Sequence, residues 1–210
     1  MVKSVYDAQL PLIIHCNGDA AIDNALNAHE LALGDAKSGD HRTGLIHCQF
    51  VRPDQLDKIA AWKLFPSFYT EHTYFFATTH IQNRGLEQTS KISPLKSALD
   101  RNIVFANHTD FNVAPIDQLF VVWTAVNRVS REGEVIDPEE RISPYEALRA
   151  LTINPAYWYR ESDRKGTIEV GKLADLVILD QNPLKVDPMA IKDIKVVETI
   201  KEGKTVFRTD

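Results

Sequence analysis

Three side chains of the kinds that bind metal ions or move protons stand at the ends of expected β-strands: His15, His47 and Asp110. In parallel α/β folds, the carboxyl ends of the strands meet at one face, where functional groups collect. Neutral imidazole and carboxylate are zinc ligands, and a catalytic zinc typically has three protein ligands plus a water. Such a zinc lowers the pKa of its water to about 7. Asp110 could accept the proton of that water and pass it to a leaving group.

The alternative is that these histidines have only a structural role in the core. A single histidine at a strand end is more often a hydrogen-bonded core residue than a metal ligand. Here Ile-His-Cys occurs twice, at 14–16 and 46–48, in the same place of two consecutive strands. His72, just past the third strand, is a further candidate for the same face. The spacing by itself leaves both interpretations open.

The other histidines are not expected to be metal ligands. His29 falls on a predicted helix and His41 in a polar loop, so both are expected to be solvated. His80 lies in a long connection, either as a lid residue or simply exposed. His108 shares a strand face with Asp110, because side chains two apart point the same way, and a packing role is favoured for it.

The elements that would position these residues alternate along the first two-thirds of the chain. Apolar runs typical of buried strands fall at 10–16, 44–50, 64–70 and 102–110, each followed by a helical pattern, at 20–33, 52–62, 94–101 and 115–128. Asp19 is a plausible N-cap, and Pro53 suits a first helical turn. Four such units in a row predict parallel strands joined by right-handed crossovers.

The end of the chain has a different character. Residues 143–159 predict one helix that opens with a capping box of Ser143 and Glu146. After position 164, β-branched alternation, a turn at 170–172 and a hairpin around 202–204 indicate short β-strands. The sequence therefore predicts a barrel-like α/β unit over 1–163 and a small β-element over 164–210.

Composition excludes several classes of function. The chain has 210 residues, 44% of them hydrophobic, and a net charge of −5, so it offers no basic stripe for a nucleic acid. No apolar run is long enough to span a bilayer, and the first residues do not form a signal peptide. Two cysteines, Cys16 and Cys48, do not make a disulfide framework, and they are expected to be small buried hydrophobes. The default expectation is a cytoplasmic protein, although a signal on a longer parent chain would not be visible.

Six segments, taken in order, resemble one known family. They are HCNGDAAID (15–23), LIHCQFVRPDQ (45–55), FPSFYTEHTYFF (65–76), FANHTDFNVAP (105–115), RISPYEALRALTINPA (141–156) and GTIEVGKLADLVILDQNP (166–183). Together they resemble the C-terminal part of the metal-dependent amidohydrolases, in the branch called amidohydrolase family 3 or YtcJ-like, which includes N-substituted formamide deformylases. The resemblance implies a distorted (β/α)8 barrel that hydrolyses C–N bonds of amides, formamides or cyclic amides.

The resemblance also implies roles for individual residues. His15 and His47 would be metal ligands that end strands five and six, and Asp110 would bind metal on strand eight and shuttle the proton. His72 would lie near the substrate. Asn17 and Asp19 would support the loop of His15. The cofactor would be one or two divalent metal ions, most simply Zn²⁺.

This sequence also departs from the family pattern. The strand-one His-x-His pair and the bridging residue near strand four are missing, so the chain corresponds to barrel strands five to eight plus part of a small β-sandwich. FFATTH replaces the family's Trp-Gly-Asp-like stretch, and HTDF replaces Ser-Asp-Phe. An open half-barrel exposes sheet edges that invite pairing, so a homo-oligomer is expected. Two functional alternatives follow: an amidohydrolase in the full-length parent, or an inactive C-terminal fragment that acts as an oligomerising or interaction module.

Overall fold

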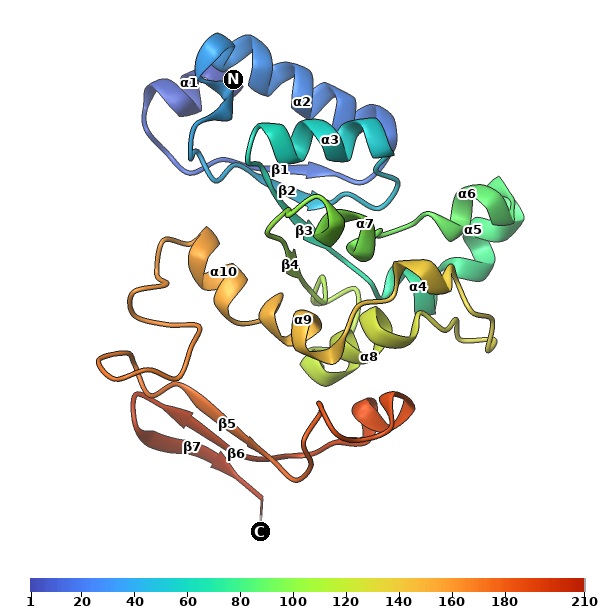
Figure 1. Cartoon of the computed structure of the whole chain (residues 1–210), viewed down its shortest axis with the longest axis vertical. Coiled ribbons are helices and arrows are strands. Elements are labelled where there is room, and N and C mark those ends of the chain that lie inside the picture. Colours follow the sequence, from blue (N-terminus) through green and yellow to red (C-terminus); the bar gives the residue numbers. More distant parts are fainter. Residues whose placement is uncertain (210) are drawn as a thin grey trace.

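A computed structural model describes residues 1–209, and its first part is built on a four-stranded parallel sheet. The strands β1 (Ile13–Cys16), β2 (Gly44–His47), β3 (Phe65–Phe68) and β4 (Ala106–Asn107) lie side by side in chain order (Figure 1). All three pairings are parallel. The predicted parallel direction is confirmed, but the strands are shorter than the apolar runs that predicted them. The ends of those runs form the loops that carry the polar side chains.

Helices cover the sheet as the alternating pattern predicts. In Figure 1, α2 (Asp19–Leu33) and α3 (Pro53–Ala61) lie together along β1 and β2, and α1 (Val2–Asp7) packs on α2. The core between α2 and the sheet contains Ile22, Leu26 and Leu45, and the two cysteines are fully buried there as free thiols. Among residues 1–209, no helix is both long and apolar enough to cross a membrane.

The connection after β3 is helical rather than an open loop. It contains α4 (His72–Phe75), α5 (Ala77–Arg84) and α6 (Leu86–Ser90), and α7 (Leu95–Asp100) then leads to β4. The remaining helices are α8 (Gln118–Asn127), α9 (Pro144–Arg149) and α10 (Ile153–Trp158), with short 3₁₀ segments at Gly34–Ser38, Pro138–Glu140 and Pro188–Asp193. The helices α4, α5 and α6 thus follow the third strand directly, at the carboxyl end of the sheet.

The single helix expected over 143–159 is wrong, because α9 and α10 are separate. A helix continuous from Pro144 would need the N–H that Pro155 lacks and would bring the proline ring against the Leu151 carbonyl. Instead α9 ends at Arg149, and Pro155 lies in the first turn of a new helix, α10. The capping box is half formed. The Ser143 hydroxyl accepts a hydrogen bond from the Glu146 N–H at 3.2 Å, but the Glu146 carboxylate pairs with Arg149 instead. Asp19 is the first residue of α2 rather than its cap, which is Gly18.

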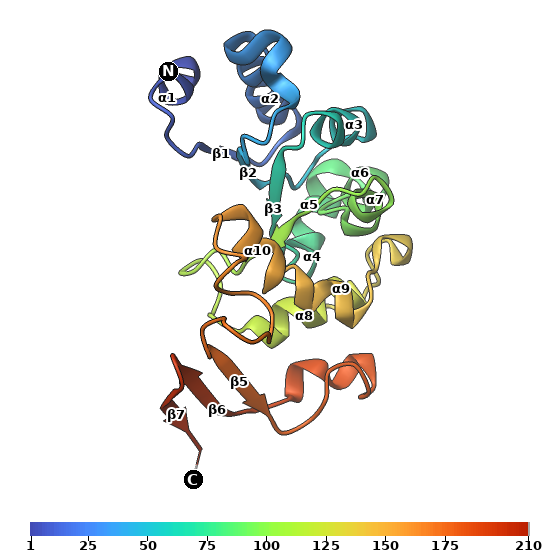
Figure 2. The ribbon, with the colours of Figure 1, turned by 60° about the vertical axis from the view of Figure 1, so that its left-hand side comes forward.

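After α10 the chain forms a second, antiparallel sheet of β5 (Leu176–Leu179), β6 (Val196–Lys201) and β7 (Lys204–Arg208). The predicted hairpin at Glu202-Gly203 joins β6 and β7, whereas residues 166–170 form no strand. Figure 2 shows this sheet as a layer below α8 and α9. The Pro188–Asp193 segment ties it to α8, because the Trp123 indole N–H donates to the Met189 carbonyl at 3.0 Å.

Candidate metal centre

Three potential metal ligands meet at the carboxyl ends of β2 and β4. Every pair of ligand atoms from His47, His108 and Asp110 lies within 4.8 Å. Nδ1 of His47 is 3.2 Å from Nε2 of His108. His47 is the last residue of β2, and His108 extends β4 because its N–H donates to the Phe68 carbonyl at 3.0 Å. The parallel sheet therefore brings together side chains that are 61 residues apart.

The backbone at this face adopts an uncommon conformation. His47, Cys48 and Asp110 have positive φ angles of 77°, 45° and 51°. A left-handed conformation in a residue other than glycine costs about 1–3 kcal/mol and gathers at functional sites. The turn after His47 is held in place because the Cys48 N–H donates to the carbonyl of Cys16 at 3.1 Å. The side chains of His47 and Asp110 converge at this face.

The structure brings together two members of the predicted triad, and His15 lies just outside the group. The His15 and His47 rings pack edge to face with centroids 4.7 Å apart. His108 takes the third place in the group, although the sequence favoured a packing role for it. The sequence did indicate that His108 lies on the same face as Asp110, because the two residues are two apart on an extended segment.

His108 is held from two sides. The Ser67 hydroxyl of β3 lies 2.8 Å from its Nδ1. The ring of Tyr69 stacks on its imidazole with centroids 5.6 Å apart and planes at 15°. These contacts fix the plane of the ring and leave Nε2 pointing toward His47.

Burial favours the neutral form of both histidines of this group. It lowers the pKa of His47, an effect that the nearby Asp110 carboxylate partly opposes. Burial also lowers the pKa of His108 to about 4, helped by the neighbouring His47. A metal-binding imidazole must be deprotonated. Together with the Asp110 carboxylate, the residues present therefore have the donor atoms and the protonation states that fit a zinc-like ion.

His72 lies on α4 beside this group. It is 8% exposed, and its ring centroid lies 5.8 Å from that of His47 and 4.4 Å from that of Tyr69. Its buried Nδ1 has no hydrogen-bond partner within the described residues. His80, on α5, lies with its Nε2 2.7 Å from the side-chain nitrogen of Gln49. The helices α4 and α5 thus place two further imidazoles beside the carboxyl ends of the strands.

Two neighbouring side chains are buried with their polar atoms unpaired among residues 1–209: the Tyr69 hydroxyl and both carboxyl oxygens of Glu71. Burial raises the pKa of Glu71 to about 8, and the Asp117 carboxylate adds to this effect. Burial also raises the pKa of Tyr69, as do the carboxylates of Glu71 and Asp110. Both side chains therefore hold their protons at neutral pH and can donate hydrogen bonds. No motif in the sequence marks either residue.

Asn17 and Asp19 link the loops that follow β1 and β2. The Asn17 carbonyl accepts from the N–H of Phe50 at 3.1 Å, and the Asp19 carbonyl accepts from the side chain of Gln55 at 2.8 Å. The Asp19 carboxylate also lies 3.8 Å from the guanidinium of Arg52. These contacts join the loop of His15 to the loop of His47.

The solvated role expected for His29 is wrong. This residue is 1% exposed, and its Nδ1 lies 2.6 Å from the hydroxyl of Tyr6 while its Nε2 lies 2.8 Å from the carbonyl of Lys37. The helix α1, which the sequence analysis did not predict, supplies Tyr6 and covers His29. His41 is half-buried nearby, with its Nε2 2.8 Å from the Ala36 carbonyl.

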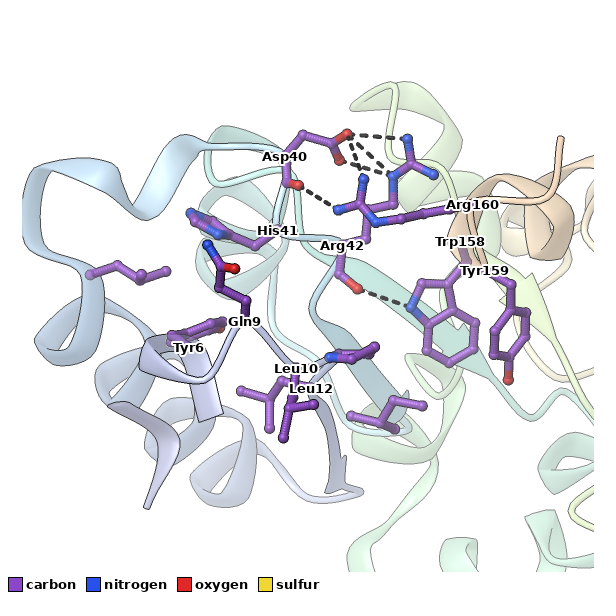
Figure 3. A pocket seen from close by; sticks show the side chains of 13 residues that line it. Tyr6, Gln9, Leu10, Leu12, Asp40, His41, Arg42, Trp158, Tyr159 and Arg160 are labelled. Carbon is purple, nitrogen blue, oxygen red and sulfur yellow. Dashed lines mark hydrogen bonds and ion pairs between the residues drawn. The ribbon is translucent and has the colours of Figure 1, made fainter. Parts of the chain in front are cut away.

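A cavity of about 430 Å³ lies at the other end of the strands (Figure 3). Its lining includes Ile13 at the start of β1 and Arg42 just before β2, so it lies away from the metal group. Asp40 pairs with Arg42, and the Trp158 N–H donates to the Arg42 carbonyl at 3.0 Å. Arg160 also lies 3.9 Å from the Asp40 carboxylate, so one carboxylate faces two guanidinium groups here. The hydrogen bonds join α10 to the segment before β2.

Comparisons with known proteins match this architecture. The chain is 30% identical over 195 residues to an N-substituted formamide deformylase of Arthrobacter pascens, covering 91% of this chain and 35% of that protein. It is 24% identical to the putative amidohydrolase YtcJ of Bacillus subtilis, covering 99% of this chain and 39% of that protein. A solved metal-dependent hydrolase of Pyrococcus furiosus, itself uncharacterized, superposes with a TM-score of 0.72 at 31% identity, over 88% of this chain and 37% of that one.

The chain thus spans between a third and two-fifths of the length of these relatives. A family model described as "Amidohydrolase family" matches residues 1–207. The match covers both sheets and every residue of the metal group. This chain belongs to the amidohydrolase family.

Proposed function

We propose that the protein to which this chain belongs hydrolyses C–N bonds of small amides, formamides or cyclic amides at a divalent metal centre. The observation that carries the proposal is the convergence of His47 and Asp110 with a second imidazole at the carboxyl ends of parallel strands. The N-substituted formamide deformylase among the relatives favours formamides as the first substrates to test.

The proposed ligands are His15, His47 and Asp110. They would hold a divalent ion, most simply zinc, which would supply Lewis-acid chemistry when bound. Asp110 takes the proton from the attacking water and delivers it to the departing nitrogen. His72, whose buried Nδ1 has no hydrogen-bond partner among residues 1–209, is proposed to hydrogen-bond the substrate. Asn17 and Asp19 hold the two loops that carry the histidines.

The test combines metal analysis with turnover. We expect the purified chain to bind about one zinc ion per monomer and, if its own residues suffice for activity, to release formate from an N-substituted formamide. Asp110→Asn is expected to abolish turnover. Asp35→Asn, on the exposed segment Gly34–Ser38, is the matched control and should behave like the wild type. A wild-type chain that binds zinc but leaves formamides, carboxamides and cyclic amides intact would contradict this activity for the chain alone.

A second candidate function is an interaction module that pairs through its open sheet edge. The strand β1 has a neighbour on one side only, and Ile13 on it is 49% exposed. An exposed edge of this kind invites pairing with another chain, and a second copy would provide it. Light scattering coupled to size exclusion should then show a dimer or larger assembly, whereas a monomer at micromolar concentration would count against this role.

A further inference from the structure

A pocket of about 460 Å³, separate from the cavity in Figure 3, lies between the segment that follows β2 and the helices α5 and α6. Its lining includes Phe50 and Arg52 on the β2 side, and Arg84, Glu87 and Lys91 on the other. We propose that this pocket binds a small planar carboxylate, which Arg84 holds with its guanidinium. The inference does not rest on the proposed hydrolysis, because none of these residues belongs to the metal group and binding can be measured without turnover.

The charge of Arg84 has no partner, unlike the other two cations of the pocket. Arg52 pairs with Asp23 at 3.0 Å, and Lys91 pairs with Asp137 at 3.1 Å. Arg84 instead lies against an aromatic ring, and within residues 1–209 its side chain has no ion pair and no hydrogen bond. A guanidinium has five N–H donors. All of them are therefore available to a ligand in the pocket.

An aromatic ring holds Arg84 in place. The guanidinium carbon lies over the Phe50 ring, 4.1 Å from its centroid, which is a favourable cation–π contact. Phe50 is itself fixed, because its N–H donates to the Asn17 carbonyl at 3.1 Å and its ring meets the His80 ring edge to face at 5.2 Å. The guanidinium therefore loses little freedom when a ligand binds, and this lowers the free-energy cost of binding.

The donors of the pocket favour a carboxylate over a phosphate. The planar fork of a guanidinium matches the two oxygens of a carboxylate, with which it forms two parallel hydrogen bonds. A phosphate carries more charge, but the second and third cations, Arg52 and Lys91, already face carboxylates. Val51 and Pro53 add apolar surface to the lining. The ligand that fits is thus a planar acid with an apolar body, for which benzoate is a suitable probe.

Glu87 offers an internal alternative to an external ligand. It lies on α6, three residues after Arg84, and lines the same pocket without an ion pair to Arg84. A movement of this side chain that brought its carboxylate onto Arg84 would compete with a bound acid. Removing the charge of Glu87 should therefore strengthen the binding of a carboxylate.

The experiment is an NMR titration of the isotope-labelled chain with benzoate, and with benzamide as the neutral match. We expect benzoate to bind in the millimolar range and benzamide at least about 10-fold more weakly, because the amide has no charge for the guanidinium. Arg84→Met should weaken benzoate binding by about 10–100-fold, and Glu87→Gln should strengthen it by about 2–5-fold. Arg131→Met removes an exposed arginine outside the pocket and should keep the wild-type affinity.

His80 provides a second measurement in the same samples. Burial and the charge of Arg84 both lower the pKa of His80, so a carboxylate bound to Arg84 should raise this pKa. The ring resonances of His80, followed against pH with and without benzoate, should show the rise in the wild type and not in Arg84→Met.

Three results would each overturn the proposal: equal binding of benzoate and benzamide, wild-type affinity for benzoate in Arg84→Met, or tighter binding of inorganic phosphate than of benzoate. An unchanged spectrum away from the pocket shows that a variant is folded. None of these results bears on the metal centre, which zinc binding to the wild-type chain tests separately.

Discussion

The indole ring of Trp158 lies directly against the backbone of Gly44, the first residue of β2. It stacks on Phe65 at 4.8 Å between centroids, and its N–H donates to the Arg42 carbonyl. A Cβ added at Gly44 would lie 2.2 Å from Cζ2 of this indole. The contact joins α10 to the sheet 114 residues earlier in the chain, and it can be tested by adding a single methyl group.

Gly44→Ala should therefore destabilise the fold by about 1–3 kcal/mol, the usual cost of forcing extra volume into a packed contact. The free energy of unfolding in urea measures this. Gly18→Ala is the matched control, because an added Cβ meets nothing within 4 Å there and φ is −86°. It should cost less, about 0.5–1 kcal/mol, because Gly18 is the N-cap of α2 and Gly is preferred over Ala there. Equal effects of the two substitutions would contradict the packing argument.

Arg128 is fully buried, and its guanidinium donates to the backbone carbonyls of Ile92, Ser93 and Ile136 at 2.7–3.0 Å. Arg128→Met keeps much of the volume but leaves these carbonyls without donors. We expect a loss of about 2–5 kcal/mol of unfolding free energy. Limited proteolysis should also cut more quickly near Ile92, because the bonds that hold this segment are gone.

The control for Arg128 is Arg131→Met, three residues further on and exposed, which should change stability by about 0.5 kcal/mol or less. Arg128→Lys should fall between wild type and Arg128→Met, because an ammonium cannot reproduce the planar fork of donors. Wild-type stability in Arg128→Met would show that the carbonyls find other partners.

Glu71 should make stability depend on pH. Its folded pKa is about 8, above the ordinary 4.5, because the carboxyl is buried. The folded chain therefore holds a proton that the unfolded chain releases. The contribution of this group is fully present below about pH 4.5 and is lost as the pH rises toward and through 8.

Urea unfolding of the wild type and of Glu71→Gln between pH 5 and pH 9 tests this expectation. The neutral amide cannot ionise, so the fall in unfolding free energy between pH 5 and pH 8 should be smaller in Glu71→Gln. Glu139→Gln, on an exposed residue, should keep the wild-type slope. A Glu71→Gln slope equal to that of the wild type would mean that Glu71 does not carry the pH dependence.

Zinc should stabilise the folded chain, because the ligands converge only after folding. A free zinc concentration 100 times the dissociation constant adds about 2.7 kcal/mol to the free energy of unfolding, and a chelator should reverse the gain. Asp110→Asn should reduce the gain, and Asp35→Asn should keep it. Equal stabilisation of both variants would show that the ion binds elsewhere.

The sequence predicted much of the architecture. The four apolar runs and the helical periods between them were sufficient to predict the parallel sheet, and Pro53 correctly marked the start of α3. Element boundaries were less well predicted. Residues 143–159 have a helical pattern throughout, yet α9 ends at Arg149 and α10 begins at Ile153, with Pro155 in its first turn. The helical spacing of apolar residues does not show where a proline lacks the backbone N–H that a continuous helix needs.

The sequence alone determined the family of this protein, because the order of the motifs can be read along the chain. It also determined the candidate residues His15, His47, His72 and Asp110, because they follow the apolar runs that predict strands. Tertiary structure alone decided that His108 joins His47 and Asp110, that His29 is buried beneath α1, and that Glu71 holds its proton at neutral pH. Each of these depends on distances between segments that are far apart in the chain. Such distances are set by strand register and packing, and no local pattern encodes them.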